Sequence, residues 1–312
     1  MKKILLALIL IIPFSIIPAL GSEIEDDYLD IAANYCVVGD YNSALQYLDK
    51  ILKINPSNKH AQDLKNGLNH VISKDNKSFI DNVSPLARQA MEYKRAGDET
   101  KEWNTLVKAT EDSNAYIAYY YLGNFYRQKK EYKSALNAYS AATSARTNFS
   151  PAYLATAIVL YEMGQYNSVI NPIDKYLSIN PEDDLAYAIK SRAEFELGLI
   201  NEAKVNNDTA IKINNCPEYQ FDRAKILYSQ GAYKESKKLF KSLLGDIQTS
   251  KIYEYLGLCD ISLGNYSDAV TDFDRAILLS KDDEYLEMKY NEAKRLLEAK
   301  NNEASQNTLL PE

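Results

Sequence analysis

The sequence predicts an all-α protein: a right-handed superhelical solenoid of about seven helix-turn-helix hairpins, ending in a C-terminal capping helix. Three observations lead to this fold class. The chain repeats itself at a nearly constant interval, apolar residues recur at helical spacing inside each copy, and a turn residue separates the two halves of each copy.

The repeat is clearest at the small residue that opens the second half of each copy. A nearly constant interval separates Ala135, Val169, Ala203, Ser236 and Ala269. An aromatic or apolar residue lies three positions upstream in each copy: Tyr132, Tyr166, Ile200, Tyr233 and Tyr266. Just before it stands a turn residue: Lys130, Gly164, Gly198, Gly231 or Gly264. Such self-similarity is typical of stacked hairpins.

Each copy reads as two amphipathic helices. In the copy that begins near residue 116, Tyr119, Leu122, Gly123 and Tyr126 recur at i, i+3, i+4 and i+7, which is one face of a helix. After the turn, Ala135, Tyr139 and Ala142 form the inward face of a second helix. Gly123 is expected to let the two helices approach closely.

These residues resemble the tetratricopeptide repeat, whose pattern is W-x2-L-G-x2-Y, then A-x3-F, then P. The copy around Tyr253, Leu256, Gly257, Ala269 and Phe273 matches it, although Asp260 replaces an aromatic residue. The copies at 184–216 and 217–249 match less well. The resemblance covers roughly residues 25–300 and implies a scaffold whose first helices line a concave, protein-binding groove.

The predicted segment boundaries depend on how closely each part of the chain matches the repeat pattern. We expect a first repeat over 22–58, then a helix, a polar connector at 74–84 and a degenerate hairpin within 59–115. The main array occupies 116–282, a polar capping helix 283–300, and a disordered tail 301–312.

Residues 1–21 have the features of a secretory signal. Lys2 and Lys3 precede an apolar run from Ile4 to Gly21, and Ala19 and Gly21 favour cleavage before Ser22. The alternative is an uncleaved N-terminal anchor, which would be the chain's only membrane attachment. Either reading predicts an extracytoplasmic protein: periplasmic, envelope-associated or secreted.

Composition and motifs argue against several classes of function. The formal net charge is −7, and cleavage of the signal would remove Lys2 and Lys3 as well, so the basic footprint of a nucleic-acid binder is missing. His60 and His70 lack metal-ligand spacing, and the sequence holds no nucleotide-binding or hydrolase motif. We therefore expect no catalytic residues, no metal and no cofactor. Cys36, Cys216 and Cys259 lie in distant repeats and are expected to remain free thiols.

The resemblance also implies candidate binding residues, namely those of the first helices that point into the groove. Carried onto this chain they are Tyr120, Asn124, Arg127, Leu154, Ile158, Tyr161, Arg192, Phe195, Phe221, Lys225 and Tyr228. The hypothesis is that this groove binds an extended peptide or protein segment, with carboxylates against the cations and apolar side chains against the aromatic rings. The alternative for any single tyrosine is packing between repeats.

Two functional classes therefore remain. One is an adaptor that holds proteins together, and the other is an architectural protein that self-associates or is anchored through its N-terminal segment. The clamp for a terminal carboxylate found in some chaperone-binding relatives is not supported, because only Asn124 matches it and Tyr120 does not.

Overall fold

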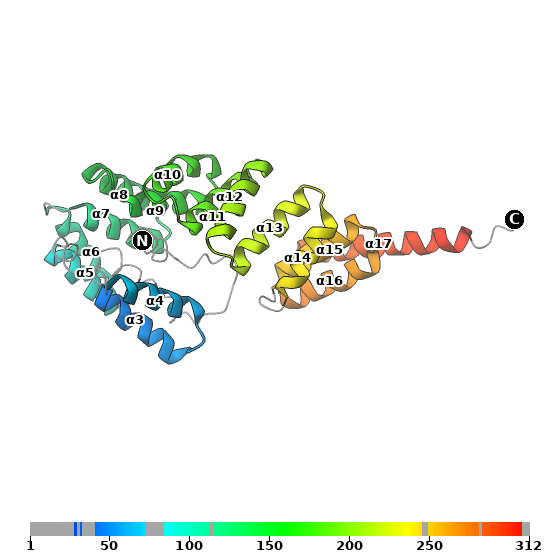
Figure 1. Cartoon of the computed structure of the whole chain (residues 1–312), viewed down its shortest axis with the longest axis horizontal. Coiled ribbons are helices and arrows are strands. Elements are labelled where there is room, and N and C mark those ends of the chain that lie inside the picture. The colour runs from blue at the N-terminus through cyan, green and yellow to red at the C-terminus, as the bar shows by residue number, and fades with distance from the viewer. Residues whose placement is uncertain are drawn as a thin grey trace. The chain divides into compact units, whose positions relative to one another are not determined.

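The computed structural model describes residues 28, 29, 32, 41–72, 84–112, 115–244, 249–280 and 283–307. The predicted signal at 1–21, nearly all of the polar connector, Cys36 and residues 308–312 lie outside the described residues. Every element in the described part is a helix, and there are fifteen, labelled α3 to α17 in Figure 1.

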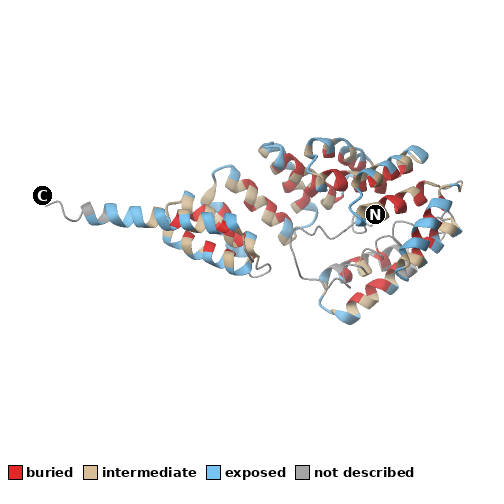
Figure 2. Ribbon diagram, turned by 180° about the vertical axis from the view of Figure 1, so that it is seen from behind, coloured by how far each residue is buried: buried red, intermediate tan, exposed pale blue. Residues whose placement is uncertain are grey.

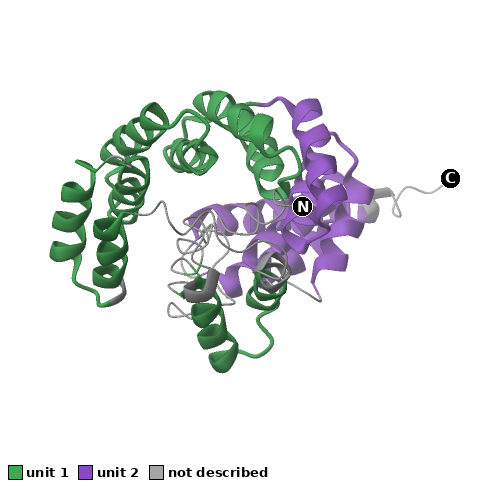
Figure 3. Ribbon diagram, turned by 60° about the vertical axis from the view of Figure 1, so that its left-hand side comes forward, with its two compact units in different colours: residues 1–197 green, residues 198–312 purple. Residues whose placement is uncertain are grey.

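The chain divides into two compact units, shown in different colours in Figure 3: unit 1 ends at Leu197 and unit 2 begins at Gly198. Unit 1 holds α3 (Tyr41–Ile54), α4 (Lys59–Ile72), α5 (Pro85–Arg95), α6 (Glu99–Ala109), α7 (Ala115–Gln128), α8 (Tyr132–Ala145), α9 (Ser150–Glu162), α10 (Tyr166–Ile179) and α11 (Asp184–Glu196). Unit 2 holds α12 (Ile200–Ile213), α13 (Pro217–Ser229), α14 (Tyr233–Leu243), α15 (Ser250–Ser262), α16 (Tyr266–Leu279) and α17 (Glu284–Asn307).

Within each unit, consecutive helices pack as hairpins that stack on their neighbours. In unit 1 the pairs α5–α6, α7–α8 and α9–α10 are in contact, and α8 also contacts α9. The degenerate hairpin predicted before residue 115 is therefore present as α5 and α6. In unit 2 the pairs α13–α14 and α15–α16 form hairpins, and α17 packs against α16.

The small residues that define the repeat are wholly buried, as the pattern predicts. Ala135, Val169, Ala203, Ser236 and Ala269 are each 0% exposed. Glycines in the first helices allow still closer contact with rings of the second helices. A Cβ atom added to Gly257 would lie 2.8 Å from the Phe273 ring, and one added to Gly123 would overlap the Tyr139 ring. Helix approach at these two places therefore requires glycine.

The predicted turn residues end the first helices in a left-handed conformation. Gly164 has a φ of 70°, and its amide donates to the carbonyl of Tyr161. Lys130 occupies the same place one repeat earlier with a φ of 59°, which costs a side chain about 1 kcal/mol. The geometry of this turn is thus kept even where the glycine is lost.

The poorly matching copies form the same helices, and polar side chains within them have hydrogen-bond partners. Lys190 stands where the pattern has Leu, and its amine donates to Asp174 of the preceding repeat at 2.7 Å. Asn207 is 1% exposed and donates to the carbonyl of Tyr219 at 3.1 Å. Buried polar side chains with hydrogen bonds are compatible with a packed core, so the weak pattern does not interrupt the helices.

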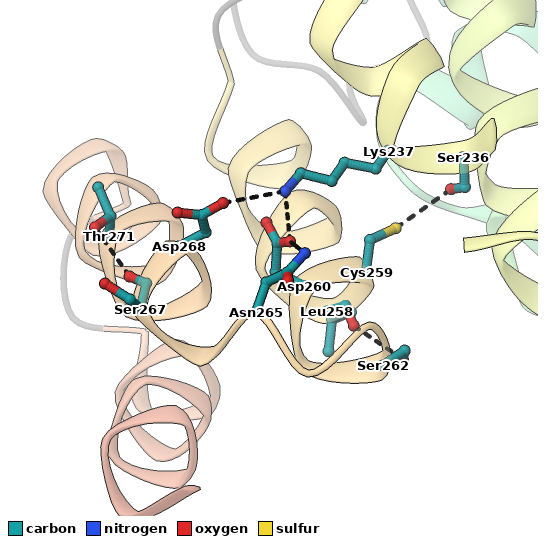
Figure 4. A network of polar contacts seen from close by, with 10 residues as sticks. All are labelled: Ser236, Lys237, Leu258, Cys259, Asp260, Ser262, Asn265, Ser267, Asp268 and Thr271. Carbon is teal, nitrogen blue, oxygen red and sulfur yellow. Dashed lines mark hydrogen bonds and ion pairs between the residues drawn. The ribbon is translucent and has the colours of Figure 1, made fainter. Parts of the chain in front are cut away.

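The largest polar substitution of this kind is in unit 2 and is drawn in Figure 4. Asp260 stands where the repeat pattern has an aromatic residue and is 0% exposed. Its carboxylate accepts from the amine of Lys237 on α14 and, at 3.0 Å, from the amide of Asn265. Asp268 on α16 lies 3.4 Å from the same amine. One side chain of α14 is thereby tied to both helices of the next hairpin.

The C-terminal helix is longer than the sequence analysis predicts. Helix α17 runs to Asn307, whereas the sequence analysis predicts a disordered tail over 301–312, so that expectation is wrong for 301–307. Residues 301–307 contain neither glycine nor proline that would end a helix. Lys300, the residue before them, donates to the carbonyl of Gly264. As expected of a cap, α17 buries Leu286 and Ala293 against the end of the stack.

Candidate protein-binding surface

The first helices of consecutive hairpins give each unit one continuous surface, here called its first-helix face. In unit 1 it is formed by α7, α9 and α11, of which α9 contacts both of the others. In unit 2 it is formed by α13, α15 and α17. Ring contacts connect the first two of these helices: Tyr255 on α15 lies 6.1 Å from Phe221 and 5.8 Å from Tyr228, both on α13.

Three of the predicted groove residues are core residues and not exposed contacts. Tyr120 is 1% exposed, and Leu154 and Ile158 are 0% exposed. The Tyr120 ring packs edge-on against Phe149 at 5.5 Å and against Tyr139 at 5.9 Å. The family pattern gives the side of the helix on which a residue lies, but large apolar side chains on neighbouring first helices pack together and exclude water. Figure 2 shows the resulting buried stripes on these helices.

The other predicted residues of unit 1 are half-buried. They are Asn124, Arg127, Tyr161, Arg192 and Phe195. The Asn124 side chain accepts from the hydroxyl of Tyr139 at 2.7 Å. Full burial raises the pKa of that Tyr139 hydroxyl well above its usual value, so it remains a donor.

Arg127 has an identified partner, which modifies the predicted role of this cation. Its guanidinium donates to both carboxylate oxygens of Glu162, and the contacts from Nε are each 3.1 Å long. Because Arg127 lies on α7 and Glu162 on α9, this bidentate ion pair fixes one first helix against the next. The carboxylate that Arg127 was expected to attract is therefore supplied by the chain itself.

The three predicted residues of unit 2 are Phe221, Lys225 and Tyr228, and all are half-buried. The rings of Phe221 and Tyr228 belong to a cluster with Phe240, Tyr233 and Tyr255. Tyr255 stacks on Phe240 with ring centroids 5.1 Å apart. Tyr255 was not among the predicted residues, although its place next to the matched residues Tyr253 and Leu256 could have indicated it.

Helix α17 contributes two further exposed side chains that the sequence analysis treated only as part of a cap. Tyr285 is 42% exposed and Met288 is 52% exposed. Burial, followed by the negative charge of Glu254 on α15, raises the pKa of Tyr285. The amine of Lys289 lies 5.9 Å from the Tyr285 ring and donates to Glu292 at 2.8 Å.

Within the described residues, no group of three or more His, Cys, Asp or Glu side chains could hold a metal ion. None of the described helices is long and apolar enough to cross a membrane. Cys216, which is half-buried, and Cys259, which is buried, are free thiols in the structure. Burial raises the pKa of Cys216 to about 12, so this thiol is unreactive at neutral pH.

Comparison with known proteins finds relatives that contain the tetratricopeptide repeat. The family model for the Fis1 C-terminal tetratricopeptide repeat matches residues 31–76. The TPR repeat-containing protein MJ1428 of Methanocaldococcus jannaschii is 25% identical over 285 residues, which cover 75% of this chain. The chain spans about half of the length of that relative, 49%.

Solved structures show the same fold. The Cut9 assembly described as the APC/C hetero-tetramer Cut9-Hcn1 matches with a TM-score of 0.58 at 15% identity, over 85% of this chain and 55% of the other. PilW, a type IV pilus biogenesis factor, matches with a TM-score of 0.56 at 16% identity, over 65% of this chain and 96% of the other. These structures show the fold. The family model and the curated relative, together with the repeated hairpins, their glycine turns and their buried small residues, support the assignment of the chain to the tetratricopeptide repeat family.

Proposed function

We propose that this chain is an exported adaptor that binds an extended segment of another protein along the first-helix face of unit 1. The observation that carries the proposal is a row of half-buried side chains on three adjacent helices. Asn124 and Arg127 come from α7, Tyr161 from α9, and Arg192 and Phe195 from α11. These side chains are only partly buried, unlike the alanines and aromatic residues of the core, so each leaves some surface that a ligand can contact.

The residue types in the row suit a protein ligand. Tyrosine and arginine are enriched among residues that dominate binding energy, because each combines a large apolar surface with a hydrogen-bonding group. The ion pair between Arg127 and Glu162 holds α7 and α9 in a fixed relation, which reduces the ordering cost of binding. We expect the bound segment to place apolar side chains on Tyr161 and Phe195 and a carboxylate near Arg192.

Capture of partners from an envelope extract tests this proposal. The purified chain is compared with a Tyr161→Ala/Arg192→Ala variant. A matched control, Lys133→Ala/Asn137→Ala, alters exposed side chains of the second helix α8. We expect the control to capture the same partner as the unmodified chain, and the first variant to lose at least about tenfold in affinity. Equal capture by both variants would refute the assignment to this face.

Export is a separate part of the proposal and rests on the N-terminal sequence. The basic start, the apolar run and the Ala-x-Gly site support a cleaved signal. Cell fractionation followed by N-terminal sequencing is the test. A mature chain that starts at Ser22 in the extracytoplasmic fraction is expected, whereas a chain that retains Met1 in the membrane fraction would favour the anchored, architectural alternative.

A further inference from the structure

The first-helix face of unit 1 carries a carboxylate of its own at a place where a ligand group is expected. Glu162 is the last residue of α9, and both of its carboxylate oxygens accept from the guanidinium of Arg127 on α7. The contacts from Arg127 Nε are each 3.1 Å long, and a third contact joins Nη2 to Oε1. Arginine binds a planar carboxylate best in such a two-point geometry. Glu162 therefore fills the position in which Arg127 would hold an acidic side chain of a bound segment.

The stability of α9 alone does not explain why a glutamate stands at its end. The C-terminus of a helix carries a partial negative charge, so a carboxylate in the last turn is unfavourable there. The ion pair with Arg127 compensates for this. The Arg127 side chain is 12% exposed and that of Glu162 is 24% exposed, so water and salt screen the pair less than they screen a fully exposed one.

A carboxylate of a ligand gains nothing by displacing Glu162. It would replace one arginine–carboxylate pair with another, and Glu162 would lose its cation and remain charged beside the new pair. A carboxylate that approaches without displacing Glu162 meets a like charge in a partly shielded place, where the repulsion is stronger than in bulk water. An acidic ligand residue is therefore disfavoured where the face is formed by α7 and α9.

Glu162 can still accept one more hydrogen bond. Its Oε1 accepts two of the three contacts from Arg127, and its Oε2 accepts one. A carboxylate oxygen has two lone pairs, so Oε2 can also accept from a donor of the ligand. A neutral donor, such as a backbone amide or an Asn or Ser side chain, suits this place because the ion pair as a whole has no net charge.

We infer that Glu162 is a specificity-determining residue of the first-helix face of unit 1. It excludes acidic side chains from the part of a bound segment that crosses α7 and α9, and it accepts a hydrogen bond from a neutral group there. The inference rests on the proposed function, since it describes the segment that this face binds. The carboxylate of that segment is then confined to the α11 end, near Arg192. Because the two ends of the face differ in this way, the segment binds in one direction only.

Selection from a phage-displayed library of random peptides tests the inference. The unmodified chain and Glu162→Gln serve as baits, and only peptides that Tyr161→Ala/Arg192→Ala no longer binds are counted. Glu162→Gln should select peptides with one additional acidic residue. It should bind each of them about tenfold more tightly than the same peptide with an amide at that residue, whereas the unmodified chain should not. The matched control Asp174→Asn, which removes the carboxylate that pairs with Lys190 from the second helix α10, should select as the unmodified chain does.

The double variant Arg127→Gln/Glu162→Gln separates specificity from a structural role. Both Glu162→Gln and the double variant lose the ion pair between α7 and α9, but only Glu162→Gln keeps the guanidinium that a ligand carboxylate can bind. The double variant should therefore not select the additional acidic residue. Equal acidic content in the peptides selected by the unmodified chain and by Glu162→Gln, or an equal gain in the double variant, would overturn this inference alone. If no peptide distinguishes the unmodified chain from Tyr161→Ala/Arg192→Ala, the proposed function fails and the inference fails with it.

Discussion

Gly123 shows how one residue sets the distance between two helices. Tyr139, which faces it, is fully buried, and its hydroxyl is held by Asn124, so the ring cannot move aside. Gly123→Ala should therefore destabilise the protein by about 1–3 kcal/mol through overpacking. In a Tyr139→Leu background the same change should cost much less, because the ring has been removed. Denaturant unfolding of the unmodified chain, the two single variants and the double variant measures these free energies. An equal cost of Gly123→Ala with and without the Tyr139 ring would contradict the close contact between them.

Asp183 is a second residue whose surroundings have a measurable consequence. It is 1% exposed, caps α11 by accepting from the amide of Ala186, and accepts from the hydroxyl of Tyr176. Burial is the largest influence on its carboxyl group and raises the pKa from 3.8 to about 6. Folding therefore favours the protonated form, so this contribution to stability is complete below about pH 4 and is lost as the pH rises through 6.

The variant Asp183→Asn isolates this effect, since the amide keeps the cap and cannot ionise. Relative to the unmodified chain, the variant should gain up to about 3 kcal/mol of unfolding free energy between about pH 4 and pH 7.5. Chemical unfolding of both proteins over this range measures the difference. If the difference in unfolding free energy between the two proteins does not change with pH, folding does not raise the pKa of Asp183.

At the scale of elements, the ion pair between Lys237 and Asp260 joins α14 to α15. Lys237→Met leaves a fully buried carboxylate without its cation and should cost about 3–5 kcal/mol. The double variant Lys237→Met/Asp260→Tyr introduces the aromatic residue of the repeat pattern and should recover most of that loss, because it removes both charges. Thermal unfolding of the unmodified chain and of both variants measures these changes in stability. A double variant less stable than Lys237→Met would show that the pocket cannot hold an aromatic ring.

The elements themselves could largely be predicted from the sequence. The spacing of the small residues placed the second helices, and Gly164, Gly198, Gly231 and Gly264 marked their turns. The end of α17 could not be placed, because polar residues with high helix propensity carry no stop signal. The partners of several polar side chains could not be predicted either. Lys190 bonds to Asp174, and Lys237 to Asp260, because stacking brings these side chains together.

The binding surface could be predicted only as a side of each helix. Family position identified Arg127, Tyr161 and Phe221 as lying on the first-helix face, but it did not distinguish them from Leu154 and Ile158, which are fully buried. Exposure depends on how tightly neighbouring repeats pack, and that is set by all side chains of the stack together. The exposure of Tyr285 and Met288 on α17 was missed for a related reason, since a cap was expected to be polar throughout.

At the scale of the whole molecule, two units assemble from the same hairpin but present different surfaces. The face of unit 1 carries arginines and aromatic residues, whereas α17 of unit 2 exposes Tyr285 and Met288. This difference favours unit 1 as the part of the chain that binds another protein.

Site-specific photocrosslinking in living cells tests the central claim, that unit 1 binds another protein on its first-helix face. A photoreactive phenylalanine analogue replaces Tyr161 in one protein and the exposed Ser140 of α8 in another. The account predicts that the first position forms a crosslink to one heterologous protein and that the second does not. A crosslink to the same protein only from Ser140 would place binding on the second helices and contradict the account.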